Sequence, residues 1–149
     1  MRYSIEVDQS NKIEQSGPTV IAFSDGISHA VVLSSAVKRA GFKALKEKGK
    51  PKSKAQIILF AAGVYLLLRD YLEQIERVKI DTEYPGKDLD IRAFLLRRIW
   101  REVPLFKSER ITFGRVGKGS PSDIKAREVR GKEGLESKKI TAEELLEVL

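Results

Sequence analysis

The sequence contains no cysteine and only one histidine, His29. The absence of cysteine excludes disulfides, thiolate zinc sites and cysteine nucleophiles. A single histidine excludes metal sites built from several imidazoles, and a Ser-His-Asp triad would depend on His29 alone. Any catalytic chemistry in this chain must therefore rest largely on oxygen ligands and amines.

The sequence also lacks a long apolar run. The longest, AQIILFAAGVYLLL at residues 55–68, has 14 residues, whereas about 20 are needed to span a bilayer. The N-terminal MRYSIEVDQS alternates and then turns polar, unlike the apolar block of a signal peptide. These patterns predict a cytoplasmic protein without a membrane partner, in which residues 55–68 form a buried helix.

Positive charge is present in excess, with 28 Lys and Arg against 21 Asp and Glu. Such a balance attracts polyanions. Residues 37–54, VKRAGFKALKEKGKPKSK, carry eight cations and one acid, and are expected to form an exposed loop or a short helix. The cations predicted to contact nucleic-acid phosphates are Lys38, Arg39, Lys43, Lys46, Lys50, Lys52 and Lys54, with Lys118 in the sequence VGKGS.

Hydrophobic periodicity predicts the order of the elements. Strands are expected at 2–8, 18–24, 29–35, 78–82 and 110–117, with a turn at Asp25-Gly26 between the second and third. Helices are expected at 54–76, with Ser53 as cap, at 89–102, with Asp88 as cap, and after the fifth strand, with Ser120 or Ser122 as cap. Residues 1–149 are expected to form one domain, in which 131–149 are an appended segment whose terminal helix begins with a capping box at Thr141 and Glu144.

Connection lengths predict how the strands pair. Short connections make the first three strands antiparallel, and helical crossovers make the fourth and fifth parallel to their neighbours. The expected fold is therefore α/β, with a five-stranded mixed sheet flanked by helices.

Three acids occupy related positions in this scheme. Asp8 and Asp81 end the first and fourth strands, and Asp123 begins the helix after the fifth. Ligands of open α/β sheets bind at the carboxyl ends of strands. Clustered carboxylates repel one another unless a cation holds them, and oxygen-only ligands suit Mg²⁺ or Mn²⁺. We therefore predict a site for two such ions at this edge.

Three short motifs resemble the ribonuclease H-like superfamily, which includes ribonuclease H and Holliday-junction resolvases. SIEVDQS resembles its first strand, KIDTEYPGK its fourth strand, and VGKGSPSDIKAREV its last loop and helix. The resemblance covers roughly residues 2–130. It implies a ribonuclease H-like fold with Asp8, Asp81 and Asp123 as catalytic metal ligands, and cleavage of phosphodiester bonds by two metal ions.

The sequence departs from ribonuclease H in one place. Ribonuclease H carries a Glu near the start of its first helix, but no acid lies between Ser53 and Leu68 here. Glu83, on the same strand face as Asp81, is the first candidate for the missing ligand, and resolvases place a Glu at this position. Glu6 and Glu14 are the other two candidates.

These observations leave three functions open. The first is a nuclease that cuts the RNA of an RNA–DNA hybrid or structured DNA. The second is an inactive ribonuclease H-like domain that binds nucleic acid. The third is an assembly module in which the apolar helix forms a homodimer interface.

Overall fold

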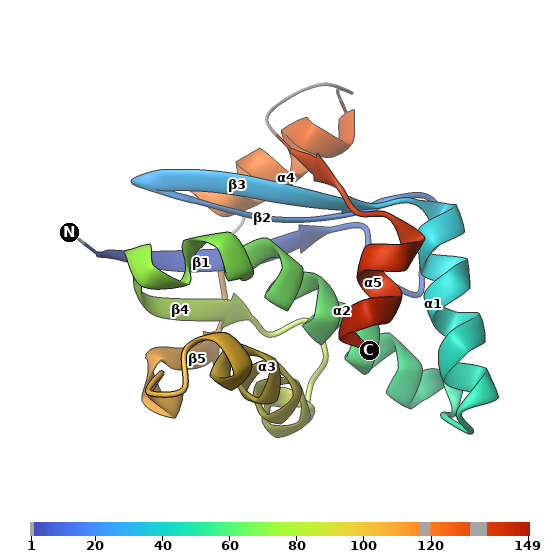
Figure 1. The fold of residues 1–149 in the computed structure, drawn as a ribbon. Helices are drawn as coiled ribbons and strands as arrows, with labels where there is room; N and C mark the ends of the chain where they lie inside the picture. The colour runs from blue at the N-terminus through green and yellow to red at the C-terminus, as the bar shows by residue number, and fades with distance from the viewer. Residues whose placement is uncertain (1, 117–119, 132–136) are drawn as a thin grey trace.

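The computed structural model describes residues 2–116, 120–131 and 137–149, without the side chains of 123 and 129–131. The fold is α/β and contains a mixed six-stranded sheet in the order β5-β4-β1-β2-β3-β6 (Figure 1). Helix α4 lies on one side of the sheet, and α1, α2, α3 and α5 lie on the other.

The first three strands form an antiparallel meander, as predicted. They are β1 (Tyr3–Ser10), β2 (Thr19–Asp25) and β3 (Ile27–Leu33). The predicted turn between β2 and β3 is confirmed at Gly26, whose φ of 83° lies in the left-handed region that favours glycine. Strand β3 begins two residues earlier than expected, because Ile27 and Ser28 pair with the end of β2.

Two crossovers add parallel strands, which confirms the predicted pairing. Strand β4 (Ile75–Asp81) lies beside β1, and β5 (Ile111–Gly114) lies beside β4. Strand β4 follows α2 (Lys52–Leu68) and the 3₁₀ segment η1 (Arg69–Gln74). Strand β5 follows α3 (Asp88–Glu102) and the 3₁₀ segment η2 (Ser108–Arg110). The helix expected to reach residue 76 therefore ends at 68, because the chain from Ile75 onward pairs with β1.

The prediction of five strands was wrong. A sixth strand, β6 (Lys138–Lys139), runs parallel to β3, and the Ile140 amide donates to the Val32 carbonyl at 2.9 Å. A pair of lysines has no apolar alternation, so periodicity gave no signal for it. The predicted capping box at Thr141 is confirmed at the start of α5 (Ala142–Val148). Glu144 of that box also pairs with Arg69 at 3.1 Å and with Lys138 at 3.0 Å.

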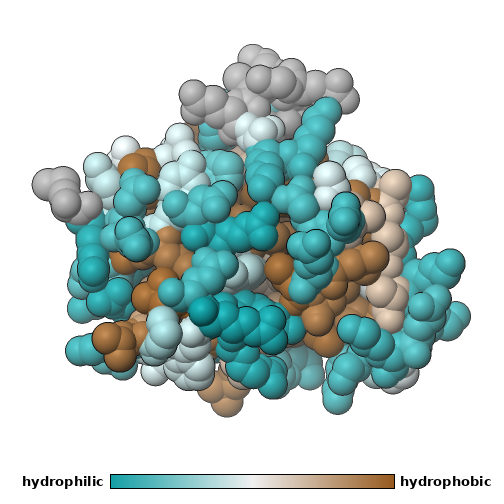
Figure 2. Space-filling model, in the orientation of Figure 1, coloured by the Kyte–Doolittle hydropathy of each residue, from teal (hydrophilic) through white to brown (hydrophobic). Residues whose placement is uncertain are grey.

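The apolar helix α2 is the centre of the core. All residues from Leu59 to Leu68 are buried, packed between the sheet and the neighbouring helices. The segment Lys52–Gln74 is long and apolar enough to cross a membrane, but 72% of its most apolar window is buried inside the protein. The helix therefore has little apolar surface left for the dimer interface on which the prediction of an assembly module rests. Figure 2 shows polar side chains over much of one face, with apolar patches between them.

The basic segment forms a regular helix, α1 (Ser35–Glu47), which is longer than expected. Ser34 caps it by accepting a hydrogen bond from the Val37 amide at 3.2 Å. The caps predicted for the next two helices were wrong. Helix α2 follows Pro51 and α3 follows Lys87, and neither has a side-chain cap, since Ser53 and Asp88 lie within the helices.

Candidate functional site

Strand register brings Asp8 and Asp81 side by side. Val7 of β1 pairs with Ile80 of β4 in parallel, so the two aspartates follow at the same level of the sheet. Asp8 is opposite Ala22 on β2, and Ala22 packs against Ala126 of α4 (Pro121–Gly131). Since directly opposed residues share one face of a sheet, Asp8 lies on the face that α4 covers.

A tight turn adds Glu83 to the pair. The Glu83 amide donates to the Asp81 carbonyl at 2.9 Å, and the intervening Thr82 amide donates to the Gly114 carbonyl at 3.1 Å. One carboxylate oxygen from each of Asp8, Asp81 and Glu83 lies within 4.8 Å of the other two. We call these three residues the acid cluster. Among the described residues it is the only group of this kind, and neither Glu6 nor Glu14 belongs to it.

Backbone amides fix the two aspartates. The Asp81 Oδ1 atom accepts from the Val116 amide at 2.7 Å, in the segment after β5. The Asp8 Oδ1 atom accepts from the Gln9 amide at 2.8 Å, and Asp8 is only 7% exposed. The cluster is therefore anchored at two points that sequence periodicity does not encode.

The third acid responds to this crowding. The pKa of Glu83 is raised to about 8, mainly by burial and also by hydrogen bonds to the carboxyl groups of Asp81 and Asp8 and by their negative charges. In the absence of a cation, a proton on Glu83 therefore relieves the repulsion among the three groups. A divalent ion would replace that proton.

The remaining predicted ligand is Asp123. Its backbone lies in the first turn of α4, the helix that packs across β1 and β2 on the Asp8 face. Its side chain lies outside the described residues, as does Lys118. Their predicted roles as metal ligand and phosphate contact remain predictions.

Tyr84 connects the acid cluster to the loop between β1 and β2. Its hydroxyl donates to Glu14 Oε1 at 3.2 Å and accepts from Gln9 Nε2 and from the Ile13 amide, each at 3.4 Å. Burial raises the pKa of Tyr84, so the hydroxyl stays protonated. Lys12, one residue before Ile13, places its Nζ atom 3.5 Å from the Glu83 carbonyl. The loop and the turn at Glu83 are thus held together.

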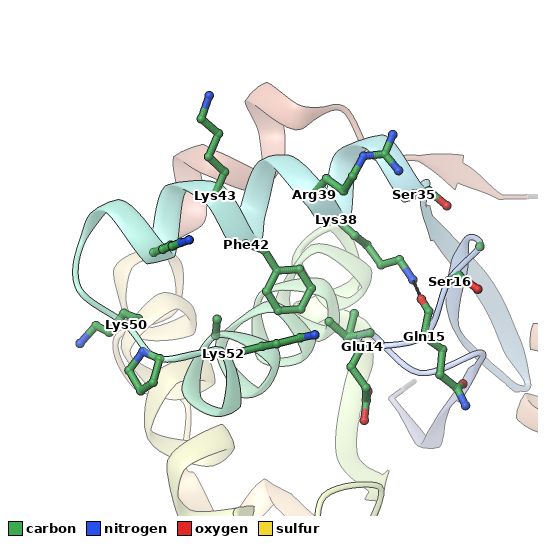
Figure 3. A pocket seen from close by; sticks show the side chains of 15 residues that line it. Glu14, Gln15, Ser16, Ser35, Lys38, Arg39, Phe42, Lys43, Lys50 and Lys52 are labelled. Carbon is green, nitrogen blue, oxygen red and sulfur yellow. Dashed lines mark hydrogen bonds between the residues drawn. The ribbon is translucent and has the colours of Figure 1, made fainter.

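The same loop borders a groove of about 990 Å³ (Figure 3). Its other walls are α1 and the start of α2. We call it the basic groove, because five of the predicted phosphate contacts line it with their side chains exposed: Arg39, Lys43, Lys46, Lys50 and Lys52. Lys54 lies apart from it and lines a smaller cavity between α2 and α3.

Lys38 differs from the other cations of this segment. It is 4% exposed, and its Nζ atom donates to the Gln15 carbonyl at 2.7 Å and to Thr19 Oγ1 at 3.1 Å. Burial lowers its pKa, and the nearby Glu14 carboxylate partly opposes that shift. The Lys38 ammonium therefore holds the β1–β2 loop, whereas the sequence analysis predicted that it contacts a phosphate.

We expect Lys38→Met to lower the free energy of unfolding by about 1–3 kcal/mol, because it removes the donor to the Gln15 carbonyl and to Oγ1 of the buried Thr19. Urea denaturation measures the loss. Lys46→Met, on the exposed side of the same helix, is the matched control and should change stability by no more than about 0.5 kcal/mol. Equal effects of the two substitutions would contradict the structural role of Lys38.

Sequence reasoning missed two residues at this site, Phe42 and Gln9. Phe42 lies in the middle of a cationic stretch, and this interleaving of an aromatic residue with cations was the available signal. Gln9 gave no signal, because its role depends on contact with Tyr84, 75 residues away. A scan against family models, a search of curated proteins and a search of solved structures each found no match to this chain.

Proposed function

We propose that this protein is a metal-dependent nuclease with a ribonuclease H-like arrangement of strands. Asp8, Asp81 and Glu83 would hold Mg²⁺ or Mn²⁺, together with Asp123. The observation that carries the proposal is the acid cluster, in which three carboxylates from β1 and the end of β4 lie within 4.8 Å of one another.

The donor set fits such an ion. All three ligands are hard oxygens, as Mg²⁺ and Mn²⁺ prefer. Two oxygens bound to one Mg²⁺ lie at most about 4.2 Å apart, which is twice the usual bond length. Neighbouring oxygens of an octahedral ion lie about 3 Å apart, so the oxygens of the acid cluster, which lie within 4.8 Å of one another, would draw together around it. The negative charges of Asp81 and Asp8 contribute to the raised pKa of Glu83, and a bound cation would relieve this repulsion.

The order of the strands also supports the proposal. A meander of β1, β2 and β3, followed by β4 and β5 added in parallel beyond β1, is the arrangement that the sequence resemblance implies. In that arrangement Asp8 and Asp81 occupy adjacent strand ends, where ligands of α/β sheets bind. Strand β6 is an addition at the far edge of the sheet.

The chain's own residues would each have a defined part. The Val116 and Gln9 amides hold the Asp81 and Asp8 carboxylates in place. Bound divalent ions would lower the pKa of an attacking water and stabilise the departing oxygen of a phosphodiester. Glu83 would lose its proton when the ions bind. The cations of the basic groove would hold the phosphate backbone of the same substrate.

A cleavage assay tests the proposal. End-labelled RNA–DNA hybrid and four-way DNA junction of matched sequence are incubated with the protein in Mg²⁺, in Mn²⁺ and in excess chelator. We expect cleavage of at least one substrate in metal and none in chelator. Absence of cleavage with either ion, combined with a melting temperature that Mn²⁺ does not change, would refute the proposal.

A further inference from the structure

The basic groove combines an apolar floor with a cationic rim. Ile13 and Ala55 are buried at its base, and Phe42 is partly buried and packs against the core. Figure 3 shows the Phe42 ring projecting from α1 into the groove, towards the side chains of Lys52 and Glu14. A flat aromatic surface therefore lies within reach of several positive charges.

The rim cations are available to an external anion. Within the part of the chain that the structure describes, none of Arg39, Lys43, Lys46, Lys50 and Lys52 forms an ion pair with an acid. The groove contains one acid, Glu14, whose Oε1 atom accepts from the Tyr84 hydroxyl. The groove thus carries five exposed positive charges against one negative charge.

The spacing of these cations favours a chain of phosphates over a single phosphate. Arg39, Lys43 and Lys46 follow one another at intervals of four and three residues, which places them on one stripe of α1 about 10 Å long. Lys50 and Lys52 continue the positive charge across the turn to α2. A row of cations of this length suits contact with successive phosphates of a polymer backbone.

We infer that the basic groove binds a single-stranded stretch of nucleic acid, with one base stacked on Phe42 and its phosphates along the stripe formed by Arg39, Lys43 and Lys46. Exposed aromatic rings in cationic grooves are the means by which proteins hold unpaired strands. A base within a duplex is stacked on both faces, so it offers no free face to Phe42. The positive charge of the groove alone would not favour a single strand over a duplex, because both carry phosphates.

This inference deepens the proposed function and rests on it for the role of the bound strand. The β1–β2 loop forms one wall of the groove, and Lys12 and Tyr84 tie that loop to the turn at Glu83. The groove and the acid cluster are therefore linked through this loop, at the end of β1 that carries Asp8. The substrate class would be nucleic acid with a single-stranded segment next to the cleavage point.

Binding without metal separates the two proposals. Fluorescence anisotropy is measured in excess chelator with a labelled single-stranded oligonucleotide of about 12 nucleotides, within the usual range of site sizes, and with the same sequence as a duplex. We expect the single strand to bind more tightly than the duplex. Asp8→Asn should bind the single strand at least as tightly as the wild type, because it removes no cation and only reduces the negative charge that repels phosphates.

Two substitutions address the stacking. Phe42→Ala should weaken binding of the single strand by about 5–150-fold, which corresponds to the loss of one stacked base. Phe42→Leu keeps apolar volume at this position and should also weaken binding, whereas Phe42→Tyr should bind as the wild type does. Circular dichroism melting of each variant shows that it is folded at the assay temperature.

A second pair of variants addresses the charge. Lys43→Gln, in the groove, should reduce the slope of log affinity against log salt by about 0.7, the value for one phosphate contact on a single strand. Lys54→Gln, outside the groove, should leave that slope unchanged. Both lysines are exposed, so the comparison isolates their positions.

The inference is overturned if Phe42→Leu binds as the wild type does, if single strand and duplex bind equally, or if Lys43→Gln and Lys54→Gln behave alike. If binding follows these expectations but no substrate is cleaved in metal, the inference stands and the proposed nuclease activity fails. If cleavage occurs and the binding comparisons fail, the activity stands and this groove is not its strand-binding site.

Discussion

Asp8→Asn should lower metal-dependent cleavage by at least about 10³-fold and abolish the rise in melting temperature that Mn²⁺ causes. The substitution keeps the shape of the side chain and the carbonyl oxygen that accepts from the Gln9 amide, but removes one negative charge from the centre of the acid cluster. Metal-assisted stabilisation of a transition state contributes several kcal/mol, and about 4 kcal/mol corresponds to a factor of 10³ in rate.

The control for this substitution is Asp70→Asn. Asp70 is an exposed aspartate of η1, which precedes the start of β4, whereas the acid cluster lies at the other end of that strand. Its loss should leave both cleavage and the Mn²⁺ shift unchanged. In the metal-free protein, Asp8→Asn should also raise the melting temperature at pH 8, because one of three crowded carboxylates is gone. Retention of the Mn²⁺ shift in Asp8→Asn would exclude the acid cluster as the metal site.

The second large effect concerns pH. Between pH 6 and pH 8 the apparent affinity for Mn²⁺ should rise by about 50-fold, close to tenfold between pH 6 and pH 7 and less steeply thereafter, and level off above pH 8. The ion must displace the proton that Glu83 retains while the pH is below its raised pKa of about 8. Isothermal titration calorimetry across this range measures the affinity and also the proton released on binding.

The stability of the metal-free protein should change in the opposite direction. The pKa of Glu83 is higher in the folded state than in the unfolded chain, where it lies near 4.5. The folded state therefore binds more protons, and its stability should fall as the pH rises from about 4.5 to about 8. Because Glu83 is partly exposed, we expect a contribution of only about 1–2 kcal/mol after solvent screening.

Glu83→Gln separates this effect from other titrations. It should remove most of the loss of stability between pH 5 and pH 8 in the absence of metal, and it should weaken Mn²⁺ binding at pH 8. Glu6→Gln is the matched control, because Glu6 lies on the same face of β1 as Asp8 but does not belong to the acid cluster. A wild-type affinity for Mn²⁺ that does not change between pH 6 and pH 8 would contradict a role for the Glu83 proton.

Much of the fold could be predicted from periodicity. The alternation in β1, the Asp25-Gly26 turn and the fully apolar helix α2 are local patterns, and each produced the expected element. Elements without a local pattern were missed or misjudged. Strand β6 is two lysines, and helix α1 lies in a cationic segment that Gly49 and Pro51 interrupt, so a loop or a short helix was expected there.

The residues of the candidate site also differ in whether a local sequence pattern identified them. Asp8, Asp81 and Glu83 were identified from the sequence because strand ends are visible in a pattern, and parallel pairing brings such ends together. The role of Lys38 was not visible, because a lysine in a cationic stretch looks the same whether its ammonium faces solvent or the Gln15 carbonyl. Phe42 was passed over because its position relative to the cations depends on how α1 lies against α2.

The sequence by itself determined the types and order of most elements, the parallel and antiparallel pairing, and the oxygen-only character of the candidate ligands. These follow from local periodicity, connection length and composition. Only the tertiary structure decided the register between β1 and β4, the turn that adds Glu83 to the two aspartates, the burial of Lys38 and the groove around Phe42. Those features depend on contacts between residues far apart in the chain, such as Gln9 with Tyr84 and Asp81 with Val116, and no local pattern specifies which of them meet.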